Sequence, residues 1–294
     1  MKKIVFSAAL LTTIFTTTSF AGEGSFGWIY TLDLQPKGTA EFEQRVQYNT
    51  GQAGGKYNFW QGRTEIEYGV TENFQIAGYL NTSYTNARRN YPATNEFPNG
   101  ETGGWGVAYP SDNNYSKWRV EGGSIEAIYR FTNPVIDPIG VGVYGEITKG
   151  TTKDELETRL LLQSNFLDDR LVVAANVVAA IEKVKFVEGE TGPESMVDIL
   201  FGASYRFASK WTAGMEARYH NDFYGYHYDK HTQRAWFFGP NVHYAAKDWW
   251  VTGAWRYQPK GGECWAPNDA ECSNGRVWDS HTKNEFIVKV GIPF

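Results

Sequence analysis

The chain lacks any apolar run, beyond its first residues, that is long enough to cross a membrane as a helix. The longest, 171–181, is interrupted by Asn176 and falls well short of the roughly 20 residues that a spanning helix needs. Charged residues make up 21% of the 294 residues. The protein is therefore expected to be either soluble or a membrane protein that crosses with β-strands.

Basic residues and cysteines are also scarce. Without Lys2 and Lys3, 26 basic residues face 33 acidic ones, a formal charge of −7 that argues against nucleic acid as a partner. The two cysteines, Cys264 and Cys272, are separated by seven residues in ECWAPNDAEC. In an oxidising compartment they are expected to form a local disulfide. A two-cysteine metal site is the alternative, but no histidine lies in this loop to complete it, and we expect neither metal nor cofactor.

The N-terminus has the layout of a secretory signal peptide. Lys2 and Lys3 precede an apolar stretch over about 4–15, and small residues occupy positions 19 and 21. This predicts a signal peptide over 1–21, because the apolar stretch is too short to span a bilayer. A single-pass anchor is the rival interpretation.

Strand-like alternation fills the rest of the chain. In NFWQGRTEIEYGV, for example, Trp60, Ile66 and Tyr68 share one phase, and Arg63 and Glu65 share the other. A period of two predicts strands, and these runs have the length that a tilted membrane-spanning strand requires. Short connections at 71–73, 133–138, 168–169, 209–210 and 247–248 alternate with longer ones such as 87–117 and 149–154. That asymmetry is typical of outer-membrane barrels.

Counting back from Phe294 predicts an all-β fold, a transmembrane antiparallel up-and-down barrel of about twelve strands over 39–294. A further alternating stretch, FGWIYTLDL, precedes a turn at 36–38. A thirteenth strand would break the even number of bacterial barrels, so residues 22–38 are predicted to be an N-terminal extension, periplasmic or entering the lumen. The alternative is a soluble β-sandwich. It is disfavoured by charge in mid-strand and by aromatics at strand ends, such as Trp60, Trp118, Trp249 and Trp250.

The last residues, NEFIVKVGIPF, alternate up to a terminal Phe294 and resemble the C-terminal signal that barrel-assembly machinery reads. Three longer stretches, YTLDLQPKGTAEFE, EARYHNDF and RAWFFGPNVHYAAKDWWVTGAW, resemble an uncharacterised family of proteobacterial outer-membrane β-barrels. The resemblance implies the fold and an outer-membrane location, with outer-membrane lipids and lipopolysaccharide as surroundings. It implies no substrate and no catalytic residue.

The polar phase of the strands is expected to line the lumen with charges of both signs. We single out nine candidate lumen-lining residues: Arg63, Glu65, Glu126, Arg159, Asp198, Glu216, Arg218, His220 and Asp222. They form either a mutually neutralising lattice that fills the interior or the wall of a narrow polar pore. The row 216, 218, 220, 222 requires partners from adjacent strands, since its members lie about 6.8 Å apart.

Two other sites are possible. His220 and Asp222 could form a rim site of an outer-membrane hydrolase, although no serine lies in phase on their strand, and His227 with His231 could bind a metal. Aromatics of the long loop, such as Tyr91, Trp105 and Tyr109, could stack on a ligand. The sequence favours a narrow passive pore or transport component for an unknown small polar solute. The alternatives are the hydrolase and a structural or adhesive barrel.

Overall fold

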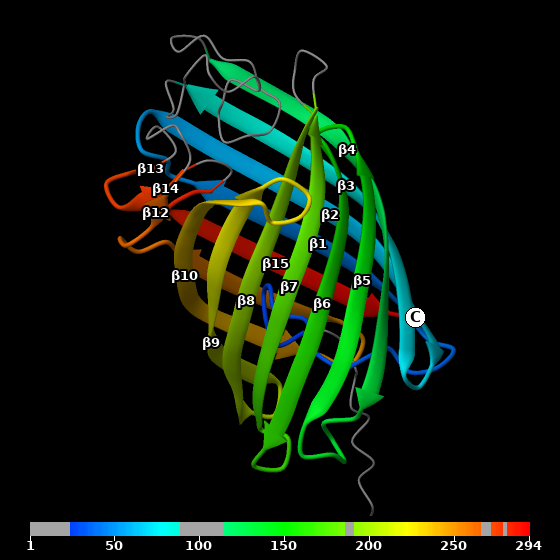
Figure 1. Ribbon diagram of the computed structural model, residues 1–294. Coiled ribbons are helices and arrows are strands. Elements are labelled where there is room, and N and C mark those ends of the chain that lie inside the picture. Colours follow the sequence, from blue (N-terminus) through cyan, green and yellow to red (C-terminus); the bar gives the residue numbers. More distant parts are fainter. Residues whose placement is uncertain (1–23, 89–113, 186–190, 266–271, 279–280) are drawn as a thin grey trace, which may run out of the picture.

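The computed structural model describes residues 24–88, 114–185, 191–265, 272–278 and 281–294. In this part of the chain, twelve long strands form one closed antiparallel barrel (Figure 1). They are β1 (Ala40–Thr50), β2 (Lys56–Thr71), β3 (Phe74–Arg88), β4 (Tyr115–Thr132), β5 (Gly140–Gly150), β6 (Lys153–Phe166), β7 (Leu171–Lys185), β8 (Thr191–Ala208), β9 (Trp211–Tyr224), β10 (Lys230–Ala245), β11 (Trp250–Tyr257) and β15 (Asn284–Pro293). The predicted twelve-stranded barrel is confirmed.

The C-terminal strand closes the barrel. β15 pairs with β11 on one side and with β1 on the other, where Val46 faces Val288 and Phe42 faces Ile292. Closure leaves neither neighbour with an open edge, which lipid could not satisfy. Three short strands lie between β11 and β15: β12 (Glu263–Cys264), β13 (Cys272–Ser273) and β14 (Arg276–Val277). A disulfide joins Cys264 to Cys272 there, as predicted.

The connections define two ends of the barrel. The turn end carries Phe294 and the connections that follow β2, β4, β6, β8 and β10; four of these are two to four residues long, and the one after β4 covers seven, 133–139. The loop end carries the others, including the segment that holds the disulfide. One predicted long loop, 149–154, is wrong. β5 ends at Gly150 and β6 begins at Lys153, so only two residues join these strands. Residues 1–21 and the loop aromatics Tyr91, Trp105 and Tyr109 lie outside the described residues.

The two faces of the wall follow the alternation. Apolar side chains such as Ile66, Ile125 and Ile147 point outwards with more than half of their surface exposed, whereas Glu65 and Glu67 point inwards and are buried. The outer surface thus presents the apolar phase that lipid-embedded barrels require. The expected outward position of Trp250 is wrong. Its ring points inwards, 4% exposed, and its indole nitrogen donates to Glu41 at 3.0 Å.

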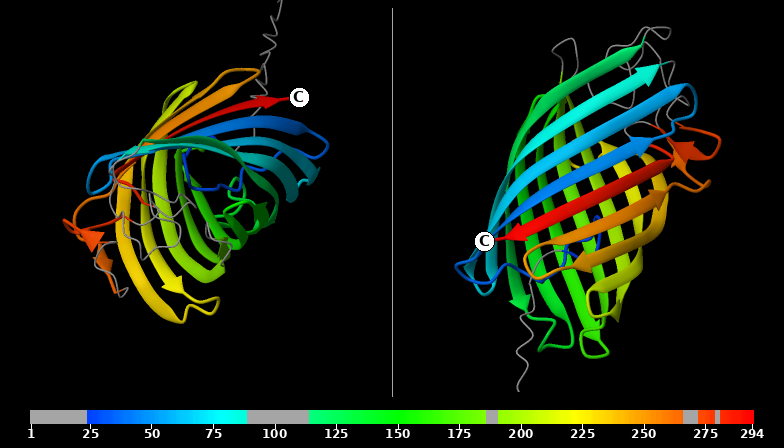
Figure 2. Two further views of the ribbon diagram at one scale, coloured as in Figure 1. Left: turned by 90° about the horizontal axis from the view of Figure 1, so that it is seen from above. Right: turned by 180° about the vertical axis from the view of Figure 1, so that it is seen from behind.

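Residues 24–35 lie inside the ring of strands (Figure 2, left, blue). This N-terminal segment passes the inner faces of β9, β7, β6 and β3 before it leads into β1. It leaves the lumen through a turn in which Thr39 N donates to Pro36 O at 3.0 Å and Gly38 has a φ of +80°. A positive φ at the third position is the signature of a type II turn and favours glycine.

No helix among the described residues is long and apolar enough to span a membrane.

Candidate functional site

The barrel wall holds the N-terminal segment by its backbone. Gly27 N and Trp28 N donate to the Glu216 carboxylate at 2.8 and 3.0 Å. Asn176 accepts from Tyr30 N at 2.8 Å and donates to Tyr30 O at 2.9 Å. Leu32 N donates to Gln163 at 2.6 Å, and Gln35 N donates to Gln75 at 2.7 Å. Side chains of the wall therefore provide hydrogen-bond partners for the backbone of an extended segment that has no strand partner over these residues.

The side chains of the same segment are held by apolar contacts. Phe26 and Ile29 pack in one buried cluster with Ala174, Val178, Leu200, Ala254 and Ile287. Leu32 packs in a second cluster with Ile128, Leu161 and Tyr144. Several of these wall residues are apolar members of the inward phase, at the heights where the segment crosses. The sequence contained this signal, because apolar residues in a lumen-facing phase need an apolar partner.

Charged residues gather beside this segment in a cluster of arginines, carboxylates and tyrosines. Arg63 lies 3.9 Å from Glu126 and 3.8 Å from Glu146, and its guanidinium stacks 3.8 Å above the ring of Tyr79. Tyr30 of the N-terminal segment receives a hydrogen bond from Arg63 at 3.0 Å and donates one to Glu126 at 3.2 Å. The segment is thereby part of the charge network rather than only an apolar filler.

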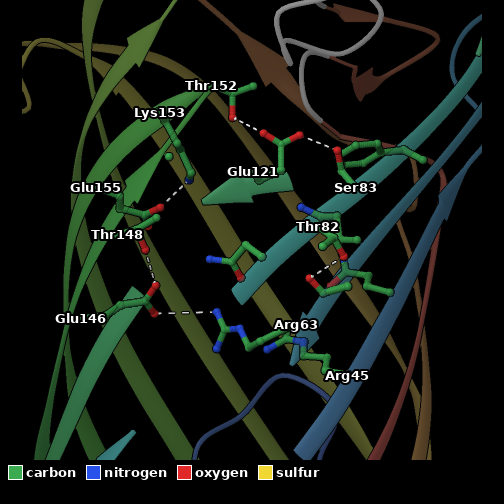
Figure 3. A pocket seen from close by; sticks show the side chains of 16 residues that line it. Arg45, Arg63, Thr82, Ser83, Glu121, Glu146, Thr148, Thr152, Lys153 and Glu155 are labelled. Atoms are coloured by element: carbon green, nitrogen blue, oxygen red, sulfur yellow. Dashed lines mark hydrogen bonds and ion pairs between the residues drawn. The ribbon is translucent and has the colours of Figure 1, made fainter. Parts of the chain in front are cut away.

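A cavity of about 190 Å³ opens towards the loop end of this cluster (Figure 3). Arg63 and Glu146 lie at its base, and Glu121 lies at its upper side between Ser83 and Thr152. Glu121 accepts from Thr151 at 2.8 Å and Thr152 at 3.2 Å, and it also contacts Ser83. Strict alternation would direct Glu121 outwards. A bulge opposite Asn81 and Thr82 turns it into the lumen instead.

A second cavity of about 260 Å³ adjoins the first, with Gln47, Gln61, Lys153 and Glu155 lining both. Lys153 bridges Glu155 at 2.5 Å and Glu182 at 2.7 Å across the boundary. The second cavity is acidic: six carboxylates line it against three lysine or arginine side chains. This excess favours cations over anions at the loop end.

The predicted row on β9 finds its partners. Asp198 of β8 binds Arg218 Nε at 2.5 Å and His220 Nδ1 at 2.8 Å. Asp222 lies 2.7 Å from His220 Nε2 and accepts from Gln233 of β10 at 2.7 Å. His220 is only 1% exposed. The row is therefore part of the folded interior, with Asp198 and Gln233 as its partners on the neighbouring strands.

His281 was missed in the sequence. It precedes β15, and its Nε2 lies 2.8 Å from His220 Nε2 and 3.5 Å from Asp222. Burial, together with the neighbouring His220, lowers the pKa of His281 to about 4. No spacing rule connects positions 220 and 281. The segment between β11 and β15 packs on β10, where Phe237 contacts Val277 and lies 5.6 Å from the His281 ring, and this packing brings His281 to His220. Of the histidine pair considered as a metal site, His227 is exposed, and His231 stacks between Phe223 and Trp265.

The structure places the nine predicted residues in three groups. Arg63 and Glu126 belong to the tyrosine-rich cluster, with Glu65 buried on the same strand as Arg63 and Arg159 stacked 4.5 Å above Tyr30. Glu216 binds the N-terminal segment. The remaining four form the β9 network with His281: Asp198, Arg218, His220 and Asp222.

Solved structures with a similar fold include outer-membrane proteins of low sequence identity. The COG4313 outer membrane channel from Pseudomonas putida F1 is 8% identical with a TM-score of 0.57, over 88% of this chain and 96% of that chain. The NanC porin is 11% identical with a TM-score of 0.52, over 85% and 98%. The β domain of the Bordetella autotransporter BrkA is 11% identical with a TM-score of 0.50, over 87% and 99%.

A comparison with curated proteins found no match. The sequence resemblance to an uncharacterised barrel family is confirmed by a family model that matches residues 18–294. The chain belongs to the family of unknown function DUF6662.

Proposed function

We propose that the protein is a narrow passive channel for small polar solutes in the outer membrane. The observation that carries the proposal is the pair of adjoining cavities at the loop end of the lumen, lined by charged groups of both signs. A polar, water-accessible lumen inside an apolar outer surface is the arrangement that a conduit needs. The named neighbours include an outer membrane channel and a porin, and this supports the same class. Lipid and lipopolysaccharide surround the barrel, and assembly machinery inserts it.

The N-terminal segment sets the conductance of this channel. It occupies the turn-end half of the lumen, where Gln163 and Gln75 hold it next to the short connections. Solutes that enter from the loop end meet the segment after the two cavities. The passage is therefore closed or very narrow while the segment is bound, and its displacement widens the passage.

Planar bilayer recording tests the channel. The wild-type barrel should give small discrete conductance steps. A variant in which 24–34 is replaced by a glycine–serine linker of equal length should conduct several-fold more, because the linker lacks the apolar anchors Phe26, Ile29 and Leu32. Heat-modifiable migration on gels checks that both barrels are folded. Folded barrels that remain silent in both forms would contradict the channel.

A disulfide cross-link tests whether the larger openings come from displacement of the N-terminal segment or from a leak elsewhere in the barrel. An ideal Cβ on Gly27 would lie 2.7 Å from both the Cβ of Ala254 and Ile287 Cγ2. A disulfide holds its Cβ atoms about 3.5–4.5 Å apart, so Gly27→Cys with Ala254→Cys can be joined once the segment moves away from the wall by about 1 Å. The oxidised double variant should lose the larger openings and regain them on reduction. Wild-type protein treated with the same reductant controls for the Cys264–Cys272 disulfide, and Gly27→Cys alone controls for the substitution.

The hydrolase is the weaker candidate. His220 is buried and both of its ring nitrogens have partners, whereas a general base must reach its substrate. Ser195, on the neighbouring strand, donates to Gly225 O at 2.7 Å instead of contacting His220. Esterase or peptidase activity that disappears in His220→Ala, together with a silent bilayer, would favour the enzyme. A structural or adhesive barrel would fail both assays.

A further inference from the structure

Three side chains from two separate parts of the chain direct ligand atoms at one point in the acidic cavity. His220 and Asp222 lie two residues apart on β9 and share its inner face, and His281 comes from the segment before β15. Their ligand atoms lie within 4.8 Å of one another. The two Nε2 atoms are 2.8 Å apart, and the carboxylate oxygen is 2.7 Å from one and 3.5 Å from the other.

Protons alone satisfy this arrangement poorly. Two imidazole nitrogens and one carboxylate oxygen converge, and each nitrogen carries at most one proton. A nitrogen that donates to Asp222 cannot also accept from the other ring. A divalent cation accepts lone pairs from all three atoms at once. Two imidazoles and one carboxylate form a ligand set typical of zinc and related transition metals.

A neighbouring carboxylate orients the first ligand. Asp198 Oδ1 lies 2.8 Å from His220 Nδ1, and Asp198 is held in turn by Arg218 Nε at 2.5 Å. Arg218 Nη2 lies 2.7 Å from the same ring nitrogen. A carboxylate on the far nitrogen of a metal-binding histidine fixes the ring and raises its basicity. Gln233 similarly positions Asp222 by a hydrogen bond of 2.7 Å.

The site is reachable from the loop end. All three side chains line the cavity of about 260 Å³, so water can complete a four-coordinate sphere. The excess of carboxylates around this cavity raises the local concentration of cations. A bound ion would also tie β9 to the segment leading into β15, across the loop end of the barrel.

We propose that His220, Asp222 and His281 bind a divalent transition-metal ion, with zinc as the best match. The inference does not depend on conduction, because it concerns equilibrium binding to the folded barrel. Bound metal stabilises the native state in proportion to its affinity, so it should also raise the unfolding midpoint.

Calorimetric titration of the chelator-treated, full-length barrel with Zn²⁺ tests the site. The wild type should bind one ion per chain. His281→Ala should lose this binding, and Asp198→Asn should weaken it about 10- to 100-fold, because it removes the charge that orients His220 and pairs with Arg218. His227→Ala is the matched control, since His227 is exposed and outside the cluster, and it should bind like the wild type.

Folding and stoichiometry decide the outcome. Heat-modifiable migration shows whether each variant is a folded barrel, and the zinc-dependent rise of the unfolding midpoint should disappear with His281→Ala. A folded wild type that binds no zinc would overturn the proposal and leave a proton-sharing cluster. Equal binding by wild type and His281→Ala would place the metal elsewhere and overturn it as well.

Discussion

Glu121 illustrates how a single position departs from alternation. Val120 points outwards, and the next residue, Glu121, points inwards. Strict alternation from Glu121 would direct Ser124 and Glu126 outwards. The bulge shifts the alternation by one residue, so all three side chains reach the interior. The cause is Gly122, whose φ of +142° is strained for any side chain. An ideal Cβ there would lie 2.0 Å from Lys149 O. The bulge therefore depends on glycine at this position.

Gly122→Ala is expected to destabilise the barrel by about 1–3 kcal/mol and to disturb the position of Glu121. Urea-driven unfolding from lipid vesicles measures the loss. Gly145→Ala on β5 is the matched control, because an added Cβ there meets no atom within 4 Å and its φ is ordinary. Equal stabilities for the two variants would show that the bulge tolerates a side chain.

The N-terminal segment shows why an alternating pattern does not always mark a strand. Phe26, Trp28, Tyr30, Leu32 and Leu34 alternate, but Ile29 and Thr31 between them are buried as well. Both faces of the segment lie inside the barrel, whereas a wall strand has lipid on one face and the lumen on the other. Its backbone bonds to glutamine, asparagine and glutamate side chains replace a strand partner.

Asn176→Leu is expected to release this segment. The change keeps roughly the size of the side chain but leaves Tyr30 N and Tyr30 O without their partner, at a cost of about 1–3 kcal/mol. Faster hydrogen exchange over 26–34 should report it, with the barrel strands unchanged. Asn58→Leu is the control, because Asn58 bonds to Tyr48 at 2.6 Å and not to the segment. Unchanged exchange in Asn176→Leu would mean that apolar packing alone holds the segment.

The closed ring ties the register of every strand to that of its neighbours. A shift by one residue would exchange the outer and inner faces of a strand. Val46 and Gln47 on β1 are adjacent in sequence, yet Val46 is 38% exposed outwards and Gln47 lines both cavities. Closure also gathers the inward-facing side chains of the strands around one lumen, which holds the two cavities.

Thiol labelling in the membrane checks this register. Val46→Cys should react with a lipid-soluble reagent, and Gln47→Cys should react with a membrane-impermeant one. The chain's two cysteines form a disulfide, so they add little background. Reversed preferences would mean a one-residue slip, and equal labelling of both would contradict a closed barrel with a polar interior.

Local patterning determined the strands, their number and their inward phase, because lipid and lumen impose a period of two that is written directly in the sequence. It also predicted the Cys264–Cys272 disulfide, whose partners are close along the chain. Trp250 has the same inward phase as Thr252 and Arg256 along β11, so alternation already encoded its position. Only the tertiary structure decided the path of residues 24–38, the inward turn of Glu121, and the meeting of His220 with His281. These depend on a bulge and on packing between positions far apart in sequence, and no local periodicity encodes such contacts.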